Sequence, residues 1–242
     1  MDRLIYLSMS AAKSAMQRQD VVSHNLANVS TNGFRAEMAA LRAVPVRGDG
    51  ASTRVHALET TVGYDDAPGV VQTTGRGLDV AMRGKAWLAV QAFDGTEAYT
   101  RAGSLHVGAD GTLVDTAGRP VLSDGGPITV PANASVEIAG DGSISATVGN
   151  ALPQAVGRLK LVTPEARLVR GADGLFRAAD GEALPADATA RLHGGALEGS
   201  NVNAVEAMVA MISAARQFEH QMKMLQNAEQ KEQTAAKLLG TT

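Results

Sequence analysis

The chain of 242 residues has no cysteine, no long apolar run and few aromatic residues. The absence of cysteine excludes disulfide scaffolds, thiol catalysis and cysteine-ligated zinc or iron–sulfur sites. No stretch approaches the roughly 18 uninterrupted apolar residues of a membrane span, so we expect no membrane-spanning segment. The apolar patch Leu4–Leu7 is short for the core of a signal peptide, which predicts that this start is retained in the mature protein.

The charge balance and the histidines also exclude several classes of function. The chain carries 22 basic and 25 acidic side chains, and its formal charge of −3 gives no basic field for nucleic acid. Its Asp-Gly pairs lack the ligand ladder of a calcium loop and are interpreted as turns. The histidines are scattered, without the spacing of metal ligands: His24, His56, His106, His193 and His220. We expect no metal, no cofactor and no catalytic residue.

The N-terminal end reads as one long helix. No glycine or proline occurs from Asp2 to about Asn28. Side chains along one stripe follow a spacing of four and three: Ile5, Met9, Ala12, Met16, Ser23 and Leu26. A helix of about 27 residues would be roughly 40 Å long, which is more than a small domain usually needs.

The C-terminal end repeats this design over a greater length. Ser200, Asn201 and Asn203 are residue types that cap or precede helices, and no glycine or proline follows until Gly240. The apolar stripe again has spacings of three and four: Val205, Met208, Ile212, Ala215, Phe218, Met222 and Leu225. A helix of about 37 residues, roughly 55 Å long, is predicted.

Two such helices at opposite ends of a chain can pack together as a coiled coil, with their remaining apolar surface facing neighbouring subunits. We favour an interface between subunits, because a monomer would struggle to cover both stripes along such lengths. Methionines on both helices suit packing against non-identical neighbours. The alternative is an antiparallel helix pair within one chain, and the sequence leaves open whether the helices pair in the subunit or only in a polymer.

The middle of the chain is different in kind. Short strand-like runs alternate with Asp-Gly and other turn signals about every 8–15 residues, which predicts an all-β meander. The fold class is therefore α+β, with long terminal helices flanking a central β domain. The expected divisions are residues 1–42, 43–201 and 202–242, and the glycine-containing segment Arg47–Thr53 is expected to be mobile in the free chain.

Several segments, taken together and in order, resemble bacterial flagellar rod and hook proteins. Asn25–Arg35 resembles the N-terminal signature of that family, and physically it is a helix exit in which Gly33 permits a positive φ and Phe34 offers an apolar anchor. Leu197–Asn203 resembles the C-terminal signature. Four further segments are similar to the central β domain of the family: Gly75–Ala81, Trp87–Val90, Tyr99–Gly103 and Asp110–Val114.

The resemblance implies a structural subunit, not an enzyme. It implies export by the flagellar type III apparatus, then helical assembly in the periplasm with copies of itself and other rod proteins. The terminal helices would form the inner tube and the β domain the outer wall, so that the rod transmits torque and encloses an export channel. Met1–Tyr6 and Leu41–Val46 are most similar to proximal-rod members, which rank before distal-rod members.

The residues expected to form the assembly interface lie on both helices and on the helix exit. They are Ile5, Met9, Ala12, Met16, Asn25, Leu26, Asn28, Thr31, Gly33, Phe34, Val205, Met208, Ile212, Phe218, Met222 and Leu225. An alternative from another class is a secreted enzyme acting on cell-wall glycan, which would need two carboxylates converging in a cleft.

Overall fold

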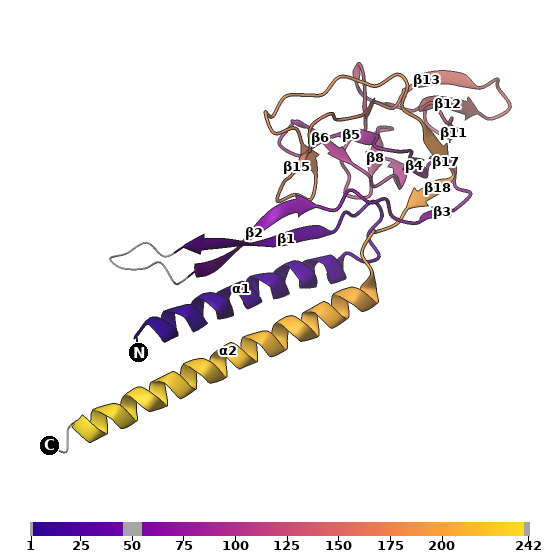
Figure 1. Ribbon diagram of the computed structural model, residues 1–242. Coiled ribbons are helices and arrows are strands. Elements are labelled where there is room, and N and C mark those ends of the chain that lie inside the picture. Colours follow the sequence, from indigo (N-terminus) through magenta and orange to yellow (C-terminus); the bar gives the residue numbers. More distant parts are fainter. Residues whose placement is uncertain (1, 46–54, 240–242) are drawn as a thin grey trace. The chain divides into compact units, whose positions relative to one another are not determined.

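The computed structural model of the chain describes residues 2–45 and 55–239 (Figure 1). These residues form two compact units, which we call the helical unit and the β unit. The helical unit holds the described residues of Met1–Val29, Ala36–Asp65 and Val202–Thr242. The β unit holds Ser30–Arg35 and Asp66–Asn201.

The helical unit is built on two long antiparallel helices, α1 (Asp2–Ala27) and α2 (Ala204–Leu239). They run side by side, with the N-terminal end of α1 and the C-terminal end of α2 at the same end of the pair (Figure 1). This confirms that the terminal helices pack together. Asn203 caps α2, because its Oδ1 accepts hydrogen bonds from the backbone N–H groups of Val205 and Glu206 at 3.1 and 3.3 Å. The sequence left open whether the two helices pair within one subunit or only in a polymer, and in the structure they pair within a single chain.

The buried positions of both helices carry small side chains. They are Ser8, Ala12 and Ala15 on α1, and Ala207, Ala214 and Ala228 on α2. The α2 positions are separated by multiples of seven residues, which is the repeat of a coiled-coil seam. Small side chains at these positions let two helix backbones approach closely. The larger Met211, Phe218 and Leu225 lie between the alanines at the same spacing and are half-buried, whereas Val205, Met208 and Ile212 are exposed.

A hairpin completes the helical unit. Strands β1 (Glu37–Pro45) and β2 (Val55–Tyr64) are antiparallel, with a register shift between Met38 and Ala39, and both contact α1. The composition of the chain changes near residue 43, inside β1, yet the hairpin is compact with the helices. The segment Arg47–Thr53, which we expected to be mobile, lies outside the described residues.

The β unit contains small antiparallel sheets, as the glycine-rich middle predicts. Its largest sheet has the order β14-β5-β6-β16-β15. The strands are β5 (Trp87–Gln91), β6 (Glu97–Thr100), β14 (Leu161–Val162), β15 (Val169–Arg170) and β16 (Phe176–Arg177). The strand-like runs expected from the sequence here are Trp87–Gln91 and Ala98–Arg101. The first coincides with β5, and β6 begins and ends one residue before the second.

The other sheets of the β unit have two or three strands each. A three-stranded sheet joins β11 (Ala134–Ile138), β12 (Ser143–Val148) and β13 (Gln154–Arg158). The pairs are β7 (Leu105–Val107) with β8 (Leu113–Asp115), β9 (Leu122–Ser123) with β10 (Gly126–Pro127), β4 (Val80–Met82) with β17 (Leu192–Gly194), and β3 (Val71–Thr73) with β18 (Ala196–Glu198). The last two pairs join residues more than a hundred positions apart in sequence.

The β unit has a single apolar core. Its members include the fully buried Leu88, Val90, Leu105, Leu113 and Val121. The tight turns between strands use the predicted Asp-Gly pairs, whose glycines have positive φ at Gly95, Gly111, Gly142, Gly174 and Gly181. None of the helices within the described residues is both long enough and apolar enough to span a bilayer.

Candidate assembly interface and its buried anchor

In the first turns of α2, the side away from the buried alanines is apolar and exposed. Val205, Met208, Val209 and Ile212 follow a spacing of three, four and seven residues and are between 52% and 70% exposed. We call these four residues the outward stripe. A helix in water does not normally leave such a row uncovered, so the stripe is a candidate contact surface.

An open hollow lies along the same helix. It has a volume of about 430 Å³ and is lined by Val209, Ile212, Ser213, Arg216, Gln217 and His220. Apolar atoms from the outward stripe therefore border polar and cationic side chains from the following turns. On α1, Tyr6, Met9 and Met16 are also more than half exposed.

The residues predicted for the interface fall into three groups in the structure. Those exposed on the helices are Met9, Met16, Val205, Met208, Ile212 and Met222. Ile5, Leu26, Phe218 and Leu225 are half-buried, and Ala12 is buried within the helical unit. The periodicity located the helices correctly, but the predicted stripe on α2 is divided: Phe218 and Leu225 are half-buried, whereas Val205, Met208, Ile212 and Met222 are exposed.

The exit of α1 is held by polar side chains. The Asn25 amide pairs with the backbone of Glu37 at the start of β1: its Nδ2 donates to the carbonyl at 3.0 Å and its Oδ1 accepts from the N–H at 2.8 Å. Nδ2 of Asn28 donates to the His24 carbonyl at 2.9 Å. The exposed Thr31 accepts a backbone hydrogen bond from Phe34 at 3.3 Å. Asn25 therefore ties the helix to the hairpin as a strand backbone would.

Gly33 and Phe34, the other predicted residues of the exit, are buried in the β unit. Gly33 has φ +69°, and a Cβ at that position would lie 2.2 Å from the carbonyl carbon of Arg101. Phe34 is 5% exposed, and the guanidinium of Arg170 lies 4.3 Å from its ring centroid. In the isolated chain these two residues therefore pack within their own β unit.

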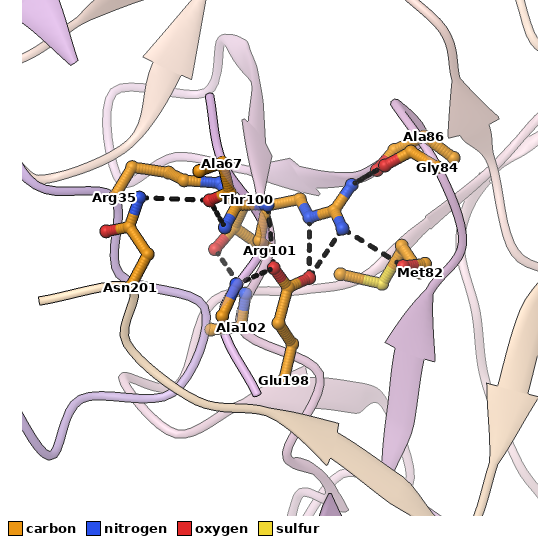
Figure 2. A network of polar contacts seen from close by, with 11 residues as sticks. Arg35, Ala67, Met82, Gly84, Ala86, Thr100, Arg101, Ala102, Glu198 and Asn201 are labelled. Carbon is orange, nitrogen blue, oxygen red and sulfur yellow. Dashed lines mark hydrogen bonds and ion pairs between the residues drawn. The ribbon is translucent and has the colours of Figure 1, made fainter. Parts of the chain in front are cut away.

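Beside Gly33 and Phe34 lies a buried ion cluster, which we call the anchor: Arg35, Arg101 and Glu198 (Figure 2). Oε1 of Glu198 accepts from Arg35 at 2.7 Å, and Oε2 accepts from Nε and Nη2 of Arg101 at 2.8 and 2.5 Å. The three residues are only 1–2% exposed. Glu198 also receives the backbone N–H of Gly69 on Oε1 at 3.1 Å.

Backbone carbonyls complete the anchor. Arg101 donates to the carbonyl oxygens of Met82, Gly84 and Ala86, and Arg35 donates to that of Ala67 (Figure 2). Burial lowers the pKa of Arg101, and the charge of Glu198 opposes this effect by favouring the charged guanidinium. A buried cluster of this kind is tolerated only when its donors and acceptors are paired, as they are here.

Sequence reasoning did not assign a role to the anchor. All three residues occur in segments that carried the family resemblance, but they are far apart in sequence and follow no common period. The available signal was one charged residue in each of three otherwise uncharged segments. Within the described residues, no three histidine, aspartate or glutamate side chains are grouped so that they could hold a metal ion.

Three family models match the chain in succession. Residues 5–35 match "Flagella basal body rod protein", residues 81–146 match "Flagellar hook protein FlgE/F/G D1 domain", and residues 193–238 match "Flagellar basal body rod FlgEFG protein C-terminal". The chain is 48% identical to the flagellar basal-body rod protein FlgF of Salmonella typhimurium and 47% identical to that of Escherichia coli, over 99% of each chain. The chain belongs to the FlgF family of flagellar basal-body rod proteins.

Membership of the FlgF family confirms the resemblance and its ranking. The FlgG protein of Bacillus subtilis, from the second-ranked group, is 30% identical over 94% of the chain and 96% of its own length. The family is structural, so the chain is a component of the flagellar basal-body rod and the secreted-enzyme alternative is wrong. The anchor takes one residue from each of the three matched regions, since Arg35, Arg101 and Glu198 lie in separate family models.

Proposed function

We propose that this FlgF-family chain is a subunit of the proximal rod that polymerises helically through the outward faces of its terminal helices. Copies of the chain and of other rod proteins are its partners, and the packed helices transmit torque and line the axial export channel. The subunit reaches the periplasm through the flagellar type III export apparatus. The names of its relatives, which are flagellar basal-body rod proteins, support this place in the rod.

The observation that carries the proposal is the outward stripe. Its four apolar side chains lie on the side of α2 opposite the alanine seam, so α1 of the same chain does not cover them. Contacts that do not close on themselves, in which one surface of a subunit meets a different surface of the next, generate a helical filament. Two helices with different exposed apolar faces are suited to such contacts.

The anchor has a different part in the proposal. It fixes the segment Ser30–Arg35, which follows α1, and the segment at Glu198, which precedes α2, within one β unit. Both chain segments leading to the helices are thus held by the same buried carboxylate. We infer that the anchor keeps the β unit rigid where load from the helices enters it.

The proposal is tested by deleting the gene for this chain and isolating hook–basal bodies from the parent and the deletion strain. Quantitative mass spectrometry of the parent particles should find the chain at a few copies per particle, and imaging of the deletion strain should show assembly stopped inside the rod. Many copies per particle with a stop nearer the hook would favour a distal position. Absence from purified particles would contradict the proposed function.

A further inference from the structure

Methionine side chains are concentrated on the outside of the helical unit. Five of those on the helices are at least 39% exposed: Met9, Met16, Met208, Met222 and Met224. In the β unit, Met82 lies in the apolar core and is 3% exposed. The thioethers that solvent can reach therefore gather on the two helices whose outer faces the proposed function uses.

Met38 on β1 is also exposed, and the readily oxidised side-chain types other than methionine are absent from the chain or buried. The chain has no cysteine, and its one tryptophan, Trp87, is 5% exposed in the β unit. Exposed methionine is therefore the group that a two-electron oxidant such as hydrogen peroxide reaches first. Oxidation converts a flexible apolar side chain into a polar one.

We propose that the exposed methionines of α1 and α2 form an oxidation site that blocks polymerisation of the free subunit while leaving its fold intact. This inference rests on the proposed function. The sulfur lone pair attacks one oxygen of hydrogen peroxide, an S–O bond forms and the O–O bond breaks. The released hydroxide takes the proton from the new S–OH group, so the products are methionine sulfoxide and water. Sulfur loses two electrons and the peroxide gains them.

The fold should survive because the fully buried positions described on α2 hold no sulfur. Ala207, Ala214 and Ala228 occupy them, and none carries an oxidisable group. Met211 is half-buried and less accessible to peroxide. The outer faces, by contrast, would bury the new sulfoxide oxygens against a neighbouring subunit. Burying a polar group without a hydrogen-bond partner weakens association about tenfold for each such group.

The test uses the purified full-length chain and hydrogen peroxide. Peptide mass spectrometry should find one added oxygen at each of Met9, Met16, Met208, Met222 and Met224, but not at Met82. Sedimentation across a concentration series should then show a rise of about tenfold or more in the concentration needed for association. The thermal unfolding midpoint of the monomer should stay unchanged.

Two variants make the test specific. Replacing Met9, Met16, Met208, Met222 and Met224 together by leucine keeps the apolar volume and should make association insensitive to peroxide. The matched control Met38→Leu alters a methionine that is 47% exposed and lies on β1 rather than on a helix, and this variant should remain sensitive.

The outcomes separate this inference from the proposed function. Association that is unchanged despite mapped sulfoxides, or a fivefold leucine variant that stays sensitive, overturns the oxidation site alone. An untreated chain that remains monomeric at every concentration overturns the proposed polymerisation, and the oxidation site with it.

Discussion

At the scale of single residues, the anchor holds two guanidinium groups against one carboxylate in the interior of the β unit. This leaves an excess positive charge, which the carbonyl oxygens around Arg35 and Arg101 help to offset. Removing the carboxylate charge leaves both guanidinium groups buried without a counter-charge. By contrast, the intact ion cluster adds little stability compared with well-packed apolar side chains of similar volume. The cluster therefore makes the β unit sensitive to changes at Glu198.

We expect Glu198→Gln to lower the free energy of unfolding by about 3–5 kcal/mol, because two buried guanidinium groups lose their counter-charge. Urea denaturation of the full chain, followed by the fluorescence of Trp87 in the β unit, measures the change. Glu165→Gln, at an exposed carboxylate of the same unit, is the matched control and should change stability by less than about 0.5 kcal/mol. Equal midpoints for the two variants would contradict a stabilising anchor.

Gly33 has a positive φ and also lies very close to the backbone of Arg101. Gly118 has a positive φ without a close neighbour, so it measures the conformational cost alone. Gly118 has φ +81°, but no atom lies within 4 Å of the position of its missing Cβ. We expect Gly118→Ala to cost about 1–2 kcal/mol from the left-handed conformation alone. Gly33→Ala should cost about a further 1–3 kcal/mol, because its Cβ would overlap the Arg101 backbone. Urea midpoints compare the two, and similar losses would be inconsistent with the close packing.

The Asp187 carboxyl group should make the stability of the fold depend on pH in a distinct way. Hydrogen bonds from the Thr163 hydroxyl at 2.7 Å and from the hydroxyl and backbone N–H of Thr189 lower the pKa of Asp187 to about 2. Because the folded pKa lies below the ordinary value of about 3.9, this carboxylate stabilises the fold above that value. The stabilisation is lost as the pH falls towards 2.

The measurement is the urea midpoint of the parent chain and of Asp187→Asn as a function of pH. The difference between the two midpoints should be constant above about pH 5 and should shrink progressively between about pH 4 and pH 2. A difference that does not vary over this range would show that the hydrogen bonds do not favour the charged carboxylate.

At the scale of secondary-structure elements, the side-chain amide of Asn25 connects α1 to β1 by hydrogen bonds like those between two strands. The two hydrogen bonds between Asn25 and the backbone of Glu37 fix where β1 begins relative to the end of α1. His24, the neighbouring residue, adds an Nδ1 contact at 3.3 Å to the Glu37 carboxylate. The helix exit is therefore a joint with defined polar contacts and not a bare turn.

Asn25→Ala should lower the free energy of unfolding by about 1–3 kcal/mol, since the backbone groups of Glu37 lose their partners. Hydrogen exchange at the Glu37 amide should accelerate, and this is the direct measurement. Gln17→Ala, at an exposed position of the same helix, should leave that exchange rate unchanged. Unchanged protection in Asn25→Ala would mean that packing, not this pair, holds the hairpin.

At the scale of the whole molecule, intrachain and outward contacts use different kinds of side chain. Alanine fills the fully buried positions of α2, and the valine, methionine and isoleucine side chains of the outward stripe remain exposed. A change on the outward stripe should therefore affect assembly without affecting the stability of the isolated chain. This separation is what distinguishes an interface residue from a core residue.

Ile212→Asp, on the outward stripe, should abolish motility in a complementation assay while the purified chain keeps its urea midpoint. A charge at this position would have to be buried without a partner in the polymer. Gln226→Asp introduces the same side chain at another exposed position of α2 and should support motility. Normal swimming with Ile212→Asp would count against the outward stripe as an assembly surface.

The sequence alone determined the helical ends, the turn-rich β middle and the family. These features depend on local periodicity, on the positions of glycine, and on segments that are contiguous in the chain. The lengths of α1 and α2 follow from uninterrupted runs without glycine or proline, and the Asp-Gly turns follow from the positive φ that they require.

Only the tertiary structure decided which helix face is inside and what holds the two chain segments together. Hydrophobicity favoured burial of large side chains such as Ile212, yet close approach of two helices selects alanine for the seam. The anchor was equally hidden, because Arg35, Arg101 and Glu198 meet through the pairing of strands that are distant in the sequence. No local pattern encodes a contact of that separation.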